Sequence, residues 1–192
     1  MKQYVCCLFL GLMFCGAAFG TTLVKEDDES ILQRAQVVVT GTVERIDATL
    51  EKNNTPFQYT TIRIEKIYKN SDATPLLQGE KIIIRQIGGT VNGITVDVAG
   101  LTKFVKESQM FLSLSKDEET GYFYVVASVQ GAYYMTNNSL INDTRANGLT
   151  FAKTSSNGQF AVSSGEVKEM TIQKMEDKIR KVAAKDAETV EE

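Results

Sequence analysis

Residues 57–68, with the sequence FQYTTIRIEKIY, decide the fold. Ile62, Ile64 and Tyr68 alternate with polar side chains along this stretch. Successive side chains of a strand point to opposite faces of a sheet, so the alternation predicts a half-buried antiparallel strand.

Strand patterns also precede and follow this stretch in the sequence. Residues 37–46 are rich in β-branched side chains, and a break in their alternation between Val43 and Ile46 predicts a β-bulge. Residues 81–87 contain three consecutive isoleucines, which predict a strand covered on both faces.

Short connections link the remaining strand patterns. Asn92-Gly93 predicts a two-residue hairpin turn with positive φ at both positions, followed by a return strand over residues 94–98. Further strands are expected at residues 110–114 and 122–129, joined by an acidic turn. About six strands with short links predict a mainly β fold, an antiparallel barrel rather than a parallel sheet.

A helix is expected before the first strand of this barrel in the sequence, and another after the last. Asp27, Asp28 and Glu29 precede a short apolar pattern, and acidic groups in the first turn favour a helix there. Ser163 and Glu166 form a capping box for a C-terminal helix. The apolar stripe of that helix predicts packing on the barrel; it consists of Val167, Met170, Met175, Ile179 and Val182.

The predicted organisation has three parts. Residues 1–20 form a signal peptide, residues 21–135 an OB-like β-barrel domain, and residues 136–192 an Asn- and Ser-rich excursion followed by the C-terminal helix. Within the excursion, short strand pieces are expected at residues 149–151 and 159–162.

The signal peptide is predicted from Lys2, the apolar run Tyr4–Phe14 and small residues before Thr21. The run is shorter than the roughly 20 apolar residues that a membrane-spanning helix needs. Cleavage near Gly20 predicts a secreted or periplasmic protein with no membrane span in its mature form. All three cysteines lie before this site, so the mature chain must build its core without disulfides.

Composition narrows the chemistry. The 192 residues include no histidine, which excludes imidazole catalysis and His-ligated metals. There are 21 basic and 24 acidic side chains, and this mildly acidic balance argues against nucleic acid as a partner.

Two loop motifs have a functional and a structural interpretation. Gly88–Gly93 is glycine-rich, but its spacing fits neither phosphate-binding motif, and hairpin geometry explains it. The acidic clusters 117–119 and 27–29 offer oxygen ligands for calcium, without the EF-hand spacing. A charged turn and a helix start explain both, so we expect no cofactor and no metal.

Two further groups of side chains are candidates for catalysis or stacking. Ser113, Ser115 and Lys116 are the remaining choice for a Ser-Lys pair, although neighbours on a strand do not converge. Five aromatic residues suggest either stacking of bases or sugars, or packing within the sheet, which is the default; they are Tyr122, Phe123, Tyr124, Tyr133 and Tyr134. We assign no catalytic, cofactor-binding or metal-binding residue.

The order of segments resembles small exported bacterial proteins of unassigned function. The resemblance covers residues 28–131 and includes Val98-Ala99-Gly100, Met110-Phe111-Leu112 and Gln130-Gly131. More distantly, the arrangement is similar to the OB-like barrel of the netrin and tissue-inhibitor-of-metalloproteinase (TIMP-like) group. That similarity implies an inhibitor or protein-binding module. Those inhibitors chelate zinc through an N-terminal cysteine, which the predicted mature chain lacks, so their mechanism does not carry over.

These observations predict an exported, non-enzymatic β-barrel module that binds another protein or an envelope component. The alternative is a hydrolase that uses paired carboxylates or the Ser-Lys pair, and a third option is a purely structural envelope protein.

Overall fold

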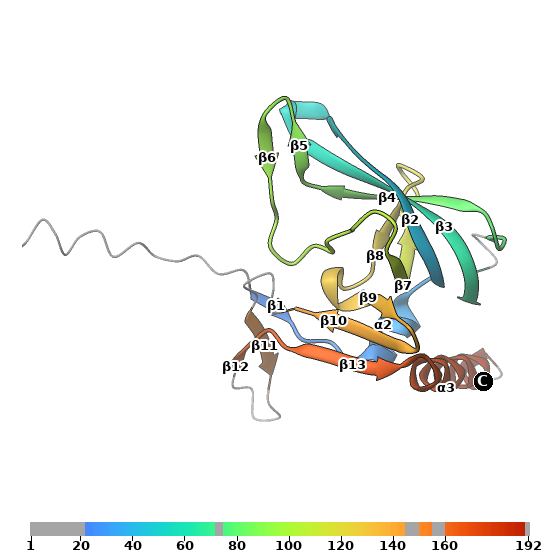
Figure 1. Cartoon of the computed structure of the whole chain (residues 1–192). Helices are drawn as coiled ribbons and strands as arrows, with labels where there is room; N and C mark the ends of the chain where they lie inside the picture. The colour runs from blue at the N-terminus through green and yellow to red at the C-terminus, as the bar shows by residue number, and fades with distance from the viewer. Residues whose placement is uncertain (1–21, 72–74, 145–149, 155–159, 191–192) are drawn as a thin grey trace, which may run out of the picture.

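The computed structural model describes residues 22–71, 75–144, 150–154 and 160–190 (Figure 1). Over these residues the chain is mainly β, with a helix at the C-terminal side, as the sequence predicts. The predicted signal peptide, residues 1–20, lies outside the described residues. Neither α2 nor α3, the α-helices of the described part, has the length and apolar character needed to cross a membrane.

Five strands form the central part of the main sheet; they are β2 (Val37–Leu50), β3 (Pro56–Lys69), β4 (Lys81–Ile87), β7 (Gln109–Lys116) and β8 (Phe123–Val125). Strand β2 lies between β3 and β7, and β3 lies between β2 and β4, all antiparallel. Strand β8 pairs with β7 and also with β4, through Ile84 opposite Phe123. The order of paired strands, β7-β2-β3-β4-β8, therefore returns to β7. The pairing of β4 with β8 is limited to one residue pair, which is too short to define a clear barrel.

The predicted antiparallel pairing is wrong at two places. Strand β8 runs parallel to β4. The turn after β7 reverses the chain, so β8 is antiparallel to β7 and has the same direction as β4. Strand β1 (Thr22–Val24) runs parallel to β11 (Thr150–Thr154), which pairs with β12 (Phe160–Ser164) in a separate small sheet. These last two strands confirm the short strand pieces expected in the excursion.

The main sheet continues beyond residue 136. Strands β9 (Ala132–Thr136), β10 (Ser139–Asp143) and β13 (Val167–Thr171) extend it from the first half of β7. The sequence gives little sign of β10, because its polar residues resemble those of the loops around it. The expected strand 122–129 is also shorter, ending at Val125 before a 3-10 turn over Ser128–Gly131.

Local signals elsewhere are confirmed. The register of β2 and β3 shifts between Val43 and Arg45, where the bulge is expected. Asn92 and Gly93 both have positive φ and connect β5 (Gly89–Val91) to β6 (Ile94–Val96). Of the three isoleucines in β4, Ile82 and Ile84 are buried but Ile83 is only half-buried, so one face of that strand is open.

Two hydrophobic cores lie on opposite faces of the sheet. Val37, Val39 and Val43 of β2 point into the first core, together with Ile62 of β3. Val38, between them in sequence, points into the second. A Cβ at Gly41 would lie 2.5 Å from the carbonyl oxygen of Arg63, so this close approach of β2 to β3 requires glycine.

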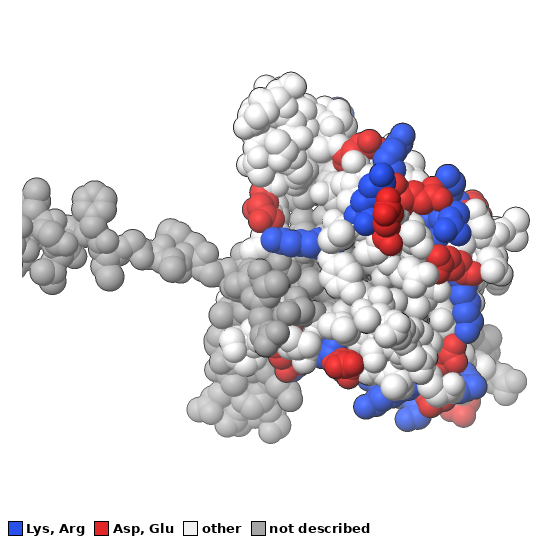
Figure 2. Space-filling model, in the orientation of Figure 1, with Lys and Arg blue, Asp and Glu red and all other residues white. Residues whose placement is uncertain are grey.

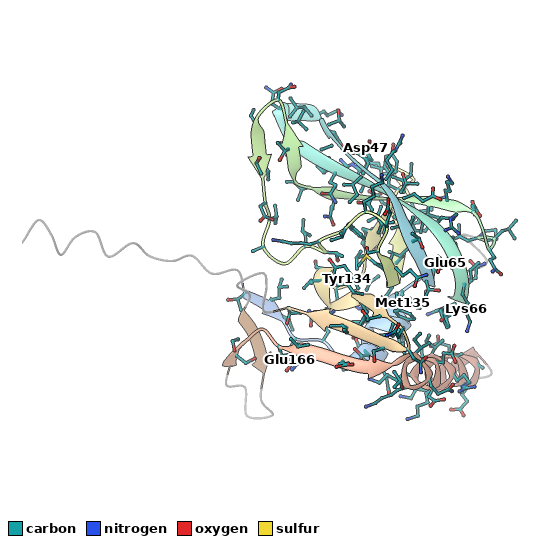
Figure 3. All side chains as sticks on the ribbon, in the orientation of Figure 1. Asp47, Glu65, Lys66, Tyr134, Met135 and Glu166 are labelled. Atoms are coloured by element: carbon teal, nitrogen blue, oxygen red, sulfur yellow. The ribbon has the colours of Figure 1, made fainter. Side chains whose placement is uncertain are left out.

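Helices α2 (Asp28–Arg34) and α3 (Ile172–Val190) cover the second core (Figure 1). Met175, Ile179 and Val182 of α3 share this core with Ile31 and Leu32 of α2, and with Val38 and Phe111 of the main sheet. The apolar stripe of the helix therefore faces the sheet. Figure 3 shows Lys66 near the end of β3 beside this helix; its ammonium group lies 2.7 Å from Glu176 of α3.

The predicted start of this helix is wrong. Residues 167–171 form β13, whose five residues all pair with β10, and the helix begins at Ile172. Pairing with a distant strand therefore outweighs the local capping signal at Ser163. Val167, expected in the apolar stripe, is exposed. The hydroxyl of Thr171 accepts a hydrogen bond from the Lys174 amide at 3.2 Å and so acts as the helix cap.

This cap generates a stability prediction. Thr171→Ala should lower the free energy of unfolding by about 0.5–2 kcal/mol, because one amide of the first helical turn loses its acceptor. Ser163→Ala is the matched control and should change it by less than about 0.5 kcal/mol. Urea unfolding of both variants gives the comparison, and a larger loss for Ser163→Ala would restore the capping box as the helix start.

Candidate functional site

The three acidic residues at the start of α2 have different surroundings. Asp27 caps the helix by accepting a hydrogen bond from the Ser30 amide at 2.9 Å. Glu29 lies on the surface, 3.4 Å from the ammonium group of Lys185. The side chain of Asp28, by contrast, is only 3% exposed. The sequence explains the first two residues but does not predict the burial of the third.

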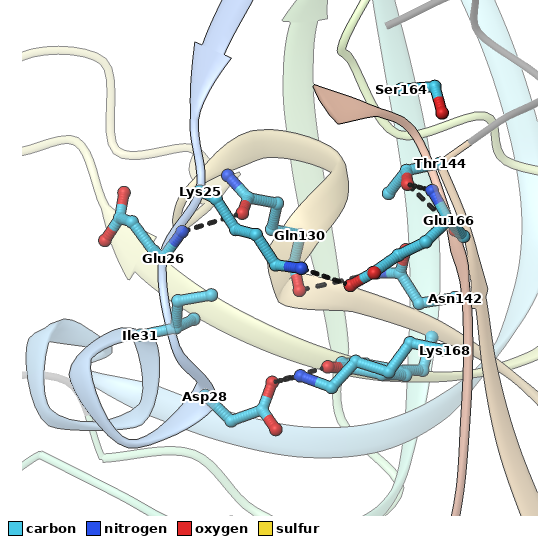
Figure 4. Close-up of a pocket in the computed structure, with 11 residues that line it drawn as sticks. Lys25, Glu26, Asp28, Ile31, Gln130, Asn142, Thr144, Ser164, Glu166 and Lys168 are labelled. Carbon is cyan, nitrogen blue, oxygen red and sulfur yellow. Dashed lines mark hydrogen bonds and ion pairs between the residues drawn. The ribbon is translucent and has the colours of Figure 1, made fainter. Parts of the chain in front are cut away.

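Asp28 joins four elements of the structure. Its carboxylate forms ion pairs with Lys168 of β13 and Lys178 of α3. It also accepts a hydrogen bond from the hydroxyl of Tyr133, on β9, at 2.7 Å. Figure 4 shows Lys168 extending to this carboxylate across the pocket. A buried charge is tolerated only when it is paired and hydrogen-bonded, and Asp28 meets both conditions.

The partners of Asp28 keep its carboxylate ionised. Burial by itself would raise the pKa of the Asp28 carboxyl, but the hydrogen bonds from Lys168, Lys178 and Tyr133 outweigh burial and hold that pKa below its usual range. Burial and the adjacent carboxylate raise the pKa of the Tyr133 hydroxyl. At neutral pH the acid is therefore ionised and the phenol protonated. A carboxylate held this way is a poor proton acceptor, so the cluster is suited to a structural role.

A small pocket of about 40 Å³ lies beside Asp28 (Figure 4). Lys25 and Glu166 pair across it at 2.6 Å, and the hydroxyl of Thr144 accepts a hydrogen bond from the Glu166 amide at 2.9 Å. Asn142 donates to the carbonyls of Val129 and Ala132 at its inner wall. Ligand sites have volumes of about 300–1,000 Å³, so this pocket has room for water rather than for an organic molecule.

A second candidate lies on the outer face of β3, β4 and β8. We call it the β3–β4 outer face; it comprises Glu51, Phe57, Tyr59, Arg85, Ile87, Tyr122 and Tyr124. Register pairs place Tyr59 opposite Arg85 and Phe57 opposite Ile87. Because these residues alternate with the buried ones, their side chains lie on the side of the sheet away from the first core.

Arg85 organises this face. Its guanidinium donates two hydrogen bonds to Glu51, at 2.8 and 2.5 Å, and lies 3.9 Å from the centre of the Phe57 ring. These bonds, with one from the hydroxyl of Tyr59, lower the pKa of Glu51 to about 2. Tyr59 in turn meets the ring of Tyr122 edge-on, with 5.2 Å between centroids. The two hydrogen bonds to Glu51 and the contact with the Phe57 ring hold Arg85 in this orientation.

Exposed apolar groups border this arrangement. Tyr124 is 48% exposed and Ile87 is 38% exposed. The neighbouring surface of β2 and β3 is different, because acids and bases alternate there (Figure 2). Arg45 pairs with Asp47 at 2.6 Å, and Arg63 pairs with Glu44 at 3.0 Å. The β3–β4 outer face therefore combines aromatic, aliphatic and arginine side chains beside a charge-paired surface.

The structure also places the other candidates named from the sequence. Gly88–Gly93 forms the β5–β6 hairpin and the approach to it. Asp117 accepts hydrogen bonds from the amide of Glu119 and the hydroxyl of Thr120, both at 2.9 Å, and so shapes its own turn. No three acidic side chains of the described residues gather as a metal site would require.

The Ser-Lys candidates do not converge. Ser113 and Ser115 are buried on one side of β7, where the Ser115 hydroxyl donates to the carbonyl of Arg34 at 3.5 Å. Lys116 is the next residue of the strand and points to the other side.

The five aromatic candidates are also dispersed. Tyr122 and Tyr124 lie on the β3–β4 outer face, whereas Phe123 is buried in the first core. Tyr133 contacts Asp28, and Tyr134 (Figure 3) donates to the carbonyl of Lys103. Alternation along the chain puts Tyr122 and Tyr124 on one face, but by itself does not connect them to Tyr59 and Arg85. The alternation along residues 57–68 and 81–87 was the available signal.

No protein-family model and no curated protein matches this sequence.

The Asp28 cluster generates a pH prediction. Asp28→Asn should lower the free energy of unfolding by about 3 kcal/mol at pH 7, because two lysines lose their partner. The native pKa is depressed, so the carboxylate stabilises the fold in full above the unfolded-state pKa of about 3.9. That contribution is lost as the pH falls through the native pKa.

Urea midpoints of both proteins between pH 7 and pH 2.5 test this prediction. The difference between wild type and Asp28→Asn should be constant above about pH 5 and should shrink below about pH 4. A difference that stays the same at every pH would show that the charge of Asp28 does not stabilise the fold.

Proposed function

We propose that this protein is an exported, non-enzymatic, OB-like β-barrel module that binds another protein or an envelope component. The observation that carries the proposal is the β3–β4 outer face, where Arg85 is held between Glu51 and Phe57 beside exposed Tyr124 and Ile87.

The strand order supports the OB-like part of the proposal. The central part of the main sheet has five strands, which are β2, β3, β4, β7 and β8 in chain order. The first of these, β2, pairs with the second, β3, and with the fourth, β7. The third and fifth are parallel neighbours. An OB-fold has this five-stranded, partly open arrangement. The single pair between β4 and β8 corresponds to the open side of such a barrel.

The chemistry of the outer face supports binding of a protein. Interface centres are enriched in tyrosine, phenylalanine and arginine, and residues that dominate binding energy are most often tryptophan, tyrosine or arginine. Tyr59 and Arg85 are already held by neighbouring side chains, so less conformational entropy is lost on binding. An aromatic and arginine surface that is ordered before binding is therefore a good candidate for a protein interface.

Site-specific photo-crosslinking tests this proposal. A photoreactive residue at position 124 should crosslink a partner in the native envelope or culture fluid, identified by mass, while one at exposed position 173 on α3 should not. Arg85→Ala should weaken the crosslink at least about tenfold, because the central side chain of the face is lost.

The melting temperature of Arg85→Ala must be measured in parallel to confirm that the variant folds. Crosslinks that form equally from positions 124 and 173, or that survive Arg85→Ala in a folded variant, would contradict the assignment of this face.

Export is a separate part of the proposal and has its own test. Lys2, the apolar run and the small residues before Thr21 support cleavage near Gly20. The N-terminus of the protein purified from its native cells should begin near Thr21. An intact Met1 or Lys2 on the protein, recovered from the cytoplasm, would contradict export.

A further inference from the structure

A cavity of about 310 Å³ lies at one end of the first core, within the size range of ligand sites. Its walls come from the ends of β3 and β4, from the β5–β6 hairpin, and from residues 97–104. Figure 1 shows this hairpin at the far end of the main sheet from α3, with the segment after β6 running back toward the sheet. Its glutamines lie on the inner side of the strands that form the β3–β4 outer face, and Ile87 at the end of β4 borders both.

Two glutamines, Gln58 and Gln86, line the cavity. Gln58 and Gln86 are directly opposite each other in the register of β3 and β4. Both share the inward-facing side with the buried residues Ile62 and Ile84. Both glutamines are half-buried and line the cavity, so hydrogen-bonding groups that they leave unused can meet a ligand.

The existing hydrogen bonds use only part of what these carboxamides offer. Gln58 donates to the hydroxyl of Thr60 at 3.1 Å, and Gln86 donates to the carbonyl of Thr102 at 3.0 Å. Each side chain has a second N–H and a carbonyl oxygen. Among the described residues, no donor is hydrogen-bonded to either of these two oxygens.

Thr102 adds a second, independent observation. It is 3% exposed, and its hydroxyl has no hydrogen-bond partner among the described residues. It stands between this cavity and a neighbouring one of about 230 Å³, and it lines both. A buried hydroxyl without a partner destabilises the free protein, unlike a valine of the same shape.

The rest of the lining sets the character of a ligand. Val96, Val98 and Phe104 supply apolar surface. The charged side chains Asp97 and Lys103 are both exposed at the rim and lie 3.5 Å apart, so they neutralise each other. The cavity therefore offers carboxamides, a hydroxyl and apolar contacts without a net charge, which favours an uncharged, polyhydroxylated ligand over an ion.

We propose that this cavity binds an uncharged N-acetylated sugar residue of an envelope polymer. The acetamido group has one N–H and one carbonyl, which match the oxygen and the second N–H of a glutamine carboxamide. Its methyl group fits the apolar side of the cavity, and a ring hydroxyl can satisfy Thr102 once rotation of that side chain turns its buried hydroxyl toward the cavity. The inference deepens the proposed function, on which it rests, by naming the chemical class of an envelope component.

The test is a titration of the ¹⁵N-labelled mature protein with N-acetylglucosamine, followed by NMR. Saturable shifts should be confined to Gln58, Gln86, Gly88, Gly89 and residues 97–104. Glucose should bind at least about tenfold more weakly, because it lacks the acetamido group. N-acetylglycine methylamide, which has amides but no sugar ring, should also bind more weakly.

Three variants locate the site. Gln86→Leu should weaken binding about tenfold or more. Thr102→Val should weaken it too, yet should not lower the melting temperature, since the hydroxyl has no partner in the free protein. Gln109→Leu, at an exposed glutamine on β7, is the matched control and should bind as wild type does.

Several results would overturn the inference. In the titration, these are the absence of shifts up to tens of millimolar N-acetylglucosamine, or shifts outside the cavity. Glucose that binds as tightly as N-acetylglucosamine, or N-acetylglycine methylamide that binds more tightly, would also overturn it. So would a Gln86→Leu variant that binds N-acetylglucosamine as wild type does. A loss of melting temperature in Thr102→Val would show that its hydroxyl already has a partner. A crosslink from position 124 that persists without sugar binding would leave the proposed function standing while the sugar site fails.

Discussion

The second hydrophobic core exists because β7 is buried on both of its faces. Met110, Leu112 and Leu114 fill the first core, while Phe111 between them packs against Tyr68 and Tyr133, with ring centroids 5.5 and 6.2 Å away. A strand in this position must have both its backbone edges paired and both its faces covered. Strands β2, β8 and β9 supply the pairing, and α2 and α3 supply the second cover.

Asp28 fixes that cover in place. One carboxylate connects α2 to β9, β13 and α3, although its partners lie up to 150 residues away in the sequence. The charges of Asp28, Lys168 and Lys178 therefore pair with one another within the fold. The groups left to meet a ligand lie on the other parts of the sheet: Arg85 and its aromatic neighbours outside, and Gln58, Gln86 and Thr102 at the end of the first core. The structure thus separates support from candidate binding surfaces.

Sequence patterns predict the parts of this structure that depend on neighbouring residues. The strand at residues 57–68, the turn at Asn92-Gly93 and the acidic start of α2 follow from local alternation, positive φ and the helix dipole. The start of α3 could not be predicted, because β13 forms by pairing with β10, a strand with no clear apolar pattern. For the candidate sites, alternation along residues 57–68 and 81–87 indicates only which side chains share a face. Arg85 meets Glu51 only through strand register, and the burial of Asp28 depends on two distant lysines.

Hydrogen exchange of Asp28→Asn, combined with capture of the crosslinked partner, tests this separation most directly. We predict faster exchange in α2 and α3, a loss of protection in β3 and β4 no larger than the fall in global stability, and undiminished crosslinking from position 124, because the binding face does not depend on the helices. Loss of crosslinking while β3 and β4 lose no more protection than this would contradict the account. In that case the helices, and not the β3–β4 outer face, would form the binding surface.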